Sequence, residues 1–198
     1  ASWPEIGEAR ELGATVIRSL LQRTGLSGEQ IGEVILGQVL TAGSGQNPAR
    51  QSVIKSGLPQ GVPAMTINKV CGSGMKAIAL AAQAIEAGRA DAIVAGGMES
   101  MSNAPYSLPN GRWGYRMNMP FGQVVDLMVF DGLHEIFYGY HMGVTAEKIA
   151  DLYKISRLEQ DEFALLSHQR ARAATASGRV ADEIVRVGIP PKKKDPGV

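Results

Sequence analysis

The sequence predicts an α/β fold in which a parallel sheet is covered by helices on both faces. Segments with helical and strand patterns alternate over residues 1–100, and the connections between them are short, as in right-handed β–α–β units. Residues 92–95 are continuously apolar, which is typical of a parallel strand buried on both faces. From Met101 onward the regular period is lost. We therefore expect an α/β domain over residues 1–100 and a mixed, mostly helical domain over residues 101–198.

The elements of the first domain follow from periodicity and from capping residues. Apolar side chains recur at helical spacing through residues 10–24, and Gly25 follows as a helix stop. Asn47 and Pro48 have the order of an N-cap and a first-turn proline, which predicts a helix that ends at Gly57. The other predicted elements are a capping-box turn at 27–30, strands at 33–40, 64–67 and 92–95, and a helix at 75–87 with Met75, Ile78, Ala79, Ala82 and Ile85 on its core side.

The second domain has fewer clear signals. Helical spacing recurs over residues 145–153, and a capping box of Ser156 and Glu159 starts a helix at 157–177 that Gly178 closes. The remaining predictions are a short helix at 123–130, a turn at 131–133, an aromatic loop at 137–143 and a strand at 183–187.

Composition excludes several classes of function. The chain has 198 residues, is 44% hydrophobic and carries a formal net charge of +1, so no bulk attraction to nucleic acid or to an anionic membrane is expected. Charged and polar residues interrupt the longest apolar run, and no membrane span is predicted. The single cysteine excludes an internal disulfide framework and fits a reducing, cytoplasmic compartment. One cysteine cannot build a zinc site, and no histidine pair has metal-ligand spacing. No metal site is expected.

Cys71 is the strongest candidate for chemistry. It stands between the predicted strand at 64–67 and the following helix, with Gly72, Ser73 and Gly74 after it. The free N–H groups and dipole of a helix start stabilise a thiolate, and small residues allow close approach of another group. The alternatives are a small buried core residue and a phosphate cradle, although the glycine spacing fits neither common phosphate-binding motif. Lys69 occupies the position of the first glycine in the hydrolase nucleophile elbow, so that motif is absent.

The histidines and the basic tail are weaker candidates. His141 lies in the aromatic loop and is either a site residue or a solvated local hydrogen-bond partner. His134 and His168 are expected at the surface. The run Lys192–Lys194 is a solvated turn or a contact for a phosphorylated ligand.

Four segments in order resemble the thiolase family. They are INKVCGSGMKAI at 67–78, VAGGMESMS at 94–102, the DGL at 131–133 followed by FYGYHMG at 137–143 and TAE at 145–147, and QD at 160–161. The segment at 140–143 is closest in character to that of acetyl-CoA C-acetyltransferases. The resemblance implies a thiolase-like N-terminal α/β layer, incomplete in this chain, with an inserted, mostly helical loop domain that binds coenzyme A.

The resemblance also implies a mechanism and a set of site residues. Cys71 would attack the thioester of acetyl-CoA or a 3-ketoacyl-CoA and hold the acyl group, and its backbone N–H would help to bind the oxyanion. Leu133, His141 and Met142 would line the pantetheine and acyl pocket. The partners would be acetyl-CoA or acyl-CoA and CoA, with no cofactor, and the protein would be a homodimer or homotetramer.

The sequence also departs from the family pattern. Family members are about twice as long, and their Gly-His-Pro histidine, Asn-Glu-Ala-Phe segment and second catalytic cysteine are not found in these residues. We therefore expect an N-terminal portion that ends inside the loop domain and has little turnover by itself. The alternatives are a 3-ketoacyl-CoA thiolase of broader chain length and a non-catalytic acyl-CoA-binding module. Chain-length preference, reaction direction and oligomer size do not follow from the sequence.

Overall fold

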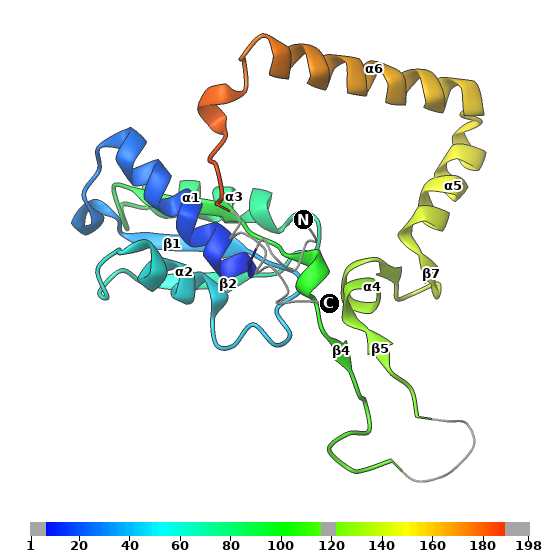
Figure 1. Ribbon diagram of the computed structural model, residues 1–198, viewed down its shortest axis with the longest axis horizontal. Coiled ribbons are helices and arrows are strands. Elements are labelled where there is room, and N and C mark those ends of the chain that lie inside the picture. The colour runs from blue at the N-terminus through cyan, green and yellow to red at the C-terminus, as the bar shows by residue number, and fades with distance from the viewer. Residues whose placement is uncertain (1–6, 116–121, 189–198) are drawn as a thin grey trace, which may run out of the picture. The chain divides into compact units, whose positions relative to one another are not determined.

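The structure, a computed structural model, describes residues 7–115 and 122–188 (Figure 1). The run Lys192–Lys194 lies outside these residues. The described part divides into two compact units. One contains residues 7–132 with 187 and 188, and the other is Leu133–Arg186.

The first unit holds the parallel sheet and the helices that cover it. Its elements are α1 (Ala9–Thr24), η2 (Gly28–Gln30), β1 (Glu33–Gly37), α2 (Pro48–Ser56), β2 (Ala64–Ile67), α3 (Ser73–Glu86), β3 (Ile93–Gly97), η3 (Met101–Asn103), β4 (Tyr106–Ser107), β5 (Val125–Asp126) and α4 (Leu127–Gly132). The strand order is β2-β1-β3, and both pairs are parallel. This confirms the predicted α/β class. Because β1 is central, its end lies between the ends of β2 and β3.

Both faces of the sheet are covered, as the sequence predicts. Val34 and Leu36 of β1 pack into a core with Ile17 of α1 and Val53 of α2. Ile35, on the opposite face, packs against Ala77 and other residues of α3. Figure 1 shows α1 and α2 together beside the sheet. The alternation along β1 therefore sends side chains into two separate helix layers.

The core side predicted for α3 is wrong. The structure buries Ser73, Ala77 and Ala81 instead, while Met75 is 78% exposed and Ile78 is 58% exposed. The reason is steric, because β1 and β3 end in glycine and α3 approaches them closely through its small residues. The helix also begins at Ser73 rather than at Met75, so its first turn follows Cys71 almost directly.

The predicted caps around α1 and α2 are confirmed. Gly25 ends α1 in the left-handed conformation, with φ of 70°. The Asn47 side chain accepts the Arg50 N–H at the start of α2, where Pro48 is the first residue. The capping box of Ser27 and Gln30 is also present. The strand predicted at 33–40 is shorter than expected, because β1 ends at Gly37 where Gln38 turns into the loop.

The second unit consists of a small hairpin followed by two helices. Its elements are β6 (His134–Glu135), β7 (Tyr140–His141), α5 (Met142–Tyr153), α6 (Arg157–Ala176) and η4 (Ala181–Glu183). The capping box of Ser156 and Glu159 that starts α6 is confirmed. The strand predicted at 183–187 is wrong, since η4 ends there and residues 184–188 have no regular structure.

Two further predictions, one on each side of the boundary between Gly132 and Leu133, need correction. The helix predicted at 123–130 begins only at Leu127, because β5 pairs with β4 first. It continues to Gly132, so it includes the first two residues of the turn predicted at 131–133, and only Leu133 lies in a turn. The aromatic loop predicted at 137–143 is instead the tip and second strand of the β6–β7 hairpin and the start of α5. Among the described residues, no helix combines the length and apolar character of a membrane span.

Candidate active site

The three parallel strands end level with one another, and the loops that follow them form one open hollow. Gly37 at the end of β1 is paired with Ile67 of β2 and with Gly97 of β3. The hollow encloses about 360 Å³ and is lined by residues from all three strand ends: Gly37, Gln38, Val39, Val70, Cys71, Ser73, Gly74, Gly97, Met98 and Glu99. The carboxyl end of a parallel sheet is the usual place for a site in an open α/β fold.

Cys71 is exposed in this hollow. The alternative that it is a buried core residue is therefore wrong. It lies one residue before Gly72, the N-cap of α3. Among the described residues, its backbone N–H has no hydrogen-bond acceptor. The Cys71 side chain is thus accessible to a ligand, and its N–H is not committed to an acceptor among the described residues.

The backbone before Cys71 turns sharply. Val70 has φ of 48°, in the left-handed region that a β-branched residue rarely adopts. The Asn68 side chain accepts the Val70 N–H at 2.8 Å. The Ser73 hydroxyl donates to the Val70 carbonyl at 2.6 Å and accepts the Lys69 N–H at 2.8 Å. Residues 68–73, called the Cys71 loop below, are therefore held by the side chains of Asn68 and Ser73.

The glycine that ends β1 lets α3 approach the sheet closely, and the contact of α3 with Gly97 at the end of β3 is looser. A Cβ on Gly37 would lie 2.6 Å from both the carbonyl carbon and the Cβ of Ser73. A Cβ on Gly97 would lie 3.6 Å from the Gly74 Cα. At position 37, any residue with a Cβ would force a shift of the Ser73 backbone, so only glycine fits there. The start of α3, and with it Cys71, is consequently fixed against the sheet.

Glu99 ties the end of β3 to the loop after β1. Its carboxylate accepts the Val39 N–H at 2.8 Å and the Leu40 N–H at 3.4 Å. The Val39 carbonyl in turn accepts a hydrogen bond from the Asn68 amide at 3.4 Å. These contacts join the three strand-end loops into one hydrogen-bonded network. The Glu99 carboxylate is engaged with backbone donors, so we assign it an anchoring role.

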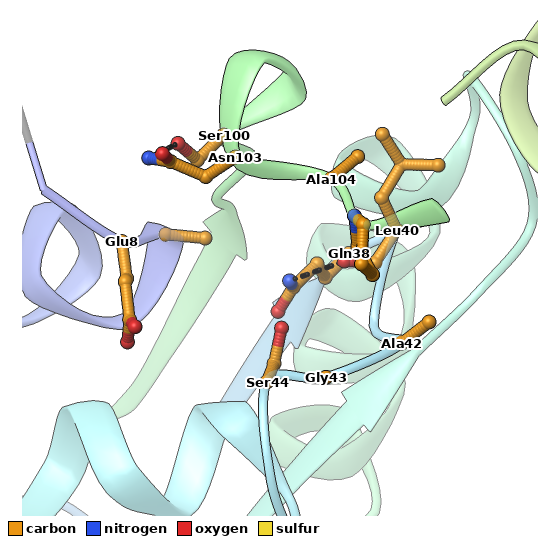
Figure 2. Close-up of a pocket in the computed structure, with 11 residues that line it drawn as sticks. Glu8, Gln38, Leu40, Ala42, Gly43, Ser44, Ser100, Asn103 and Ala104 are labelled. Carbon is orange, nitrogen blue, oxygen red and sulfur yellow. Dashed lines mark hydrogen bonds between the residues drawn. The ribbon is translucent and has the colours of Figure 1, made fainter. Parts of the chain in front are cut away.

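A second hollow lies at the same edge of the sheet (Figure 2). Gln38 is only 2% exposed and lines both hollows. Its amide N–H donates to the Leu40 carbonyl at 3.0 Å. Its Oε1 is buried without a partner among the described residues, and Figure 2 shows it on the side of Ser44. A buried acceptor of this kind normally binds water or a ligand donor.

The predicted substrate-binding residues Leu133, His141 and Met142 lie together in the second unit. His134 pairs with His141 across the β6–β7 hairpin, and the Met142 N–H donates to the Leu133 carbonyl at 2.8 Å. The Nδ1 of His141 accepts the Gly143 N–H at 3.0 Å and caps α5. Because Nδ1 accepts a hydrogen bond, the proton of the neutral His141 ring lies on Nε2, which can donate to a ligand. The His141 side chain is exposed.

The sequence did not indicate an aromatic and cationic cluster on the same hairpin. The rings of Tyr138 and Tyr140 stack with centroids 5.8 Å apart. The Lys148 ammonium of α5 lies 4.2 Å from the Tyr140 ring centroid. The alternation of aromatic residues at 138 and 140 is the signal in the sequence that indicates this strand, although the segment as a whole predicts a loop. This contact connects the hairpin to α5.

Cys71 belongs to the first unit, and Leu133, His141 and Met142 belong to the second.

The structural roles of Ser73, Asn68 and Glu99 were not predicted. Ser73 and Asn68 are polar residues within a tight glycine-rich turn, which is the signal that could have shown them. The described residues contain no group of three or more His, Cys, Asp or Glu side chains that could hold a metal ion.

Comparison with known proteins finds a match to the thiolase N-terminal domain family over residues 6–198. Three similar curated proteins are acetyl-CoA acetyltransferases of Pseudomonas aeruginosa (59% identical) and Cupriavidus necator (58%), and a probable acetyl-CoA acetyltransferase of Escherichia coli (56%). The matches cover 95%, 95% and 90% of this chain. They cover 47%, 47% and 45% of the relatives, so the chain spans about half their length.

Proposed function

The chain belongs to the thiolase family through its N-terminal domain, and from this premise we propose that it transfers acyl groups between coenzyme A thioesters through an acyl-enzyme on Cys71. In the synthetic direction two acetyl-CoA molecules give acetoacetyl-CoA and CoA, and the reaction is reversible. The names of the similar proteins support acetyl-CoA as substrate.

In the first half-reaction the Cys71 thiolate attacks the carbonyl carbon of acetyl-CoA. A bond forms between Sγ and this carbon, and negative charge develops on the carbonyl oxygen. When the oxyanion collapses, the bond between carbon and the coenzyme A sulfur breaks. Coenzyme A leaves as a thiolate, and the acetyl group remains on Cys71.

In the second half-reaction the methyl group of a second acetyl-CoA loses a proton, which in the net balance converts the released coenzyme A thiolate into the thiol. The resulting carbanion attacks the carbonyl carbon of the acetyl group. A carbon–carbon bond forms, and Cys71 leaves as thiolate. In the degradative direction the thiol of free CoA takes the acyl group instead.

One observation carries the proposal. The thiol of Cys71 is exposed at the carboxyl end of the sheet, and its own N–H has no acceptor among the described residues. An exposed nucleophile with an adjacent free N–H donor is the arrangement that acyl transfer requires, because the donor stabilises charge only as the oxyanion forms.

The substrate pocket is the second part of the proposal. We place Leu133, His141 and Met142 at the pantetheine and acyl pocket. The hydrogen bond between Met142 and Leu133 and the cap formed by His141 bring the three residues into one small region of the second unit. We further propose that the enzyme is cytoplasmic, acts as a homodimer or homotetramer, and uses no cofactor beyond its coenzyme A substrates.

Acylation of Cys71 tests the function directly. The chain is incubated with acetyl-CoA, and the released CoA and the intact mass are followed together. We expect one acetyl group per chain, located at Cys71 by peptide mapping, and none in Cys71→Ala. Binding of acetyl-CoA by calorimetry without acetylation would support the non-catalytic binding module and overturn the proposal. A panel of acyl-CoA lengths separates an acetyl-specific enzyme from a broader 3-ketoacyl-CoA thiolase.

A further inference from the structure

The peptide between Val70 and Cys71 is held from its carbonyl side. The Val70 carbonyl accepts two hydrogen bonds from Ser73, one from the hydroxyl at 2.6 Å and one from the backbone N–H at 3.1 Å. The N–H of the same peptide belongs to Cys71 and has no acceptor among the described residues.

The geometry of the peptide bond links these two ends. A trans peptide is planar, and its N–H points opposite to its C=O. Fixing the direction of the Val70 carbonyl therefore fixes the direction of the Cys71 N–H. Hydrogen bonds accepted by the carbonyl also polarise the peptide and strengthen its N–H as a donor.

The Ser73 side chain is itself rigidly placed. It is 4% exposed. Its oxygen accepts the Lys69 N–H while its proton goes to Val70. Gly37 packs directly against it. With its proton engaged in this way, the hydroxyl is placed to orient the backbone rather than to attack a substrate.

We propose that Ser73 is a positioning residue that orients and polarises the Cys71 N–H toward the oxyanion of the acylation step. The inference rests on the proposed function, since it assigns the Cys71 N–H as the oxyanion donor. It predicts that Ser73 matters for reactions that create an oxyanion, and much less for other reactions of the same thiol.

Two reactions of Cys71 separate these effects. Acetylation, by acetyl-CoA or by an activated acetyl ester, passes through an oxyanion. Alkylation by iodoacetamide does not, because a bond forms between Sγ and a saturated carbon while the carbon–iodine bond breaks. The full chain and its variants are compared by the ratio of the acetylation rate to the alkylation rate, each over a range of pH.

For Ser73→Ala we expect this ratio to fall by about 10-fold or more, since loss of one oxyanion donor costs roughly 100- to 1,000-fold in well-studied enzymes. Ser73→Thr keeps the hydroxyl and should restore most of the ratio.

Asn68→Ala loosens the same loop but leaves the Val70 carbonyl bonded, so its ratio should change less. Ser52→Ala removes another fully buried hydroxyl, which bonds Arg10 and Pro48 instead, and controls for general destabilisation.

The remaining outcomes overturn either the inference on Ser73, or the proposed function, or both. An unchanged ratio in Ser73→Ala, or an equal fall in Asn68→Ala, would show that Ser73 only stabilises the loop. Acetylation of the unmodified chain by the ester but not by acetyl-CoA would overturn the proposed function, and the ester would still test Ser73. Alkylation without acetylation by either reagent would overturn both.

Discussion

Gly37 and Ser73 approach so closely that a Cβ on Gly37 would stand 2.6 Å from the Cβ of Ser73. This contact sets the start of α3 directly against the end of β1. It explains why α3 buries its small face and why Cys71, two residues before Ser73, lies at the level of the strand ends.

Gly37→Ala should therefore destabilise the fold. Its Cβ meets backbone as well as side-chain atoms of the first turn of α3, and overpacking of this kind typically costs about 1–3 kcal/mol. Chemical denaturation measures the change in the free energy of unfolding. Gly96→Ala is the matched control, because no atom lies within 4 Å of a Cβ at that position in β3. Equal losses in the two variants would contradict this account.

Val70→Asn should stabilise the chain. Val70 is 51% exposed and has φ of 48°, so little burial is lost. Asparagine tolerates the left-handed region that costs other residues roughly 1–2 kcal/mol. We expect a gain of about 1 kcal/mol in urea denaturation. Val70→Ala removes the β-branch but lacks the short polar side chain that can hydrogen-bond locally in this region, so it should gain less. A less stable Val70→Asn would show that the observed turn is not strained.

The stability of the first turn of α6 should depend on pH in the acid range. The backbone N–H of Ser156, followed by its hydroxyl, holds the pKa of Glu159 below its ordinary value of 4.5. Because the folded pKa is lowered, the stabilisation is fully present above pH 4.5 and is lost as the pH falls through the lowered pKa.

An NMR titration of the Glu159 carboxyl checks this expectation. Ser156→Ala should move the pKa of Glu159 part of the way back, since the hydroxyl is only one of the two donors. In Glu159→Gln the helical signal of α6 should lose its dependence on this titration. A Glu159 carboxyl that titrates at or above 4.5 would refute the assigned cause.

Cys71 should be alkylated by iodoacetamide at neutral pH faster than a small free thiol. It is exposed and directly precedes the N-cap of α3, where the positive end of the helix dipole favours an attacking anion. Rate constants with peptide mass mapping provide the measurement. The same chain unfolded in guanidinium is the internal control and should react at the rate of the free thiol. A folded chain that reacts more slowly than the unfolded chain would contradict the prediction.

Local signals in the sequence were reliable where neighbouring residues alone decide the structure. The N-cap at Asn47 and the capping box of Ser156 with Glu159 were predicted correctly because each is a contact between residues three apart. The aromatic segment around Tyr140 predicts a loop, whereas the structure pairs Tyr140 and His141 in a hairpin, because strand pairing depends on partners across the turn. The prediction of a strand at 183–187 is wrong for the same reason, because the pattern of five residues does not show whether a neighbouring strand is available to pair with them.

The sequence alone determined the alternation of elements, the family resemblance and the choice of Cys71, because periodicity and short motifs are written in consecutive residues. Only the tertiary structure showed which face of α3 is buried, since Gly37 and Ser73 are far apart in the chain and meet only after folding. Likewise, only the structure showed the Ser73 hydroxyl on the Val70 carbonyl and the Glu99 carboxylate on the loop after β1. These contacts depend on backbone directions that no residue pattern states, and they hold the Cys71 loop in place.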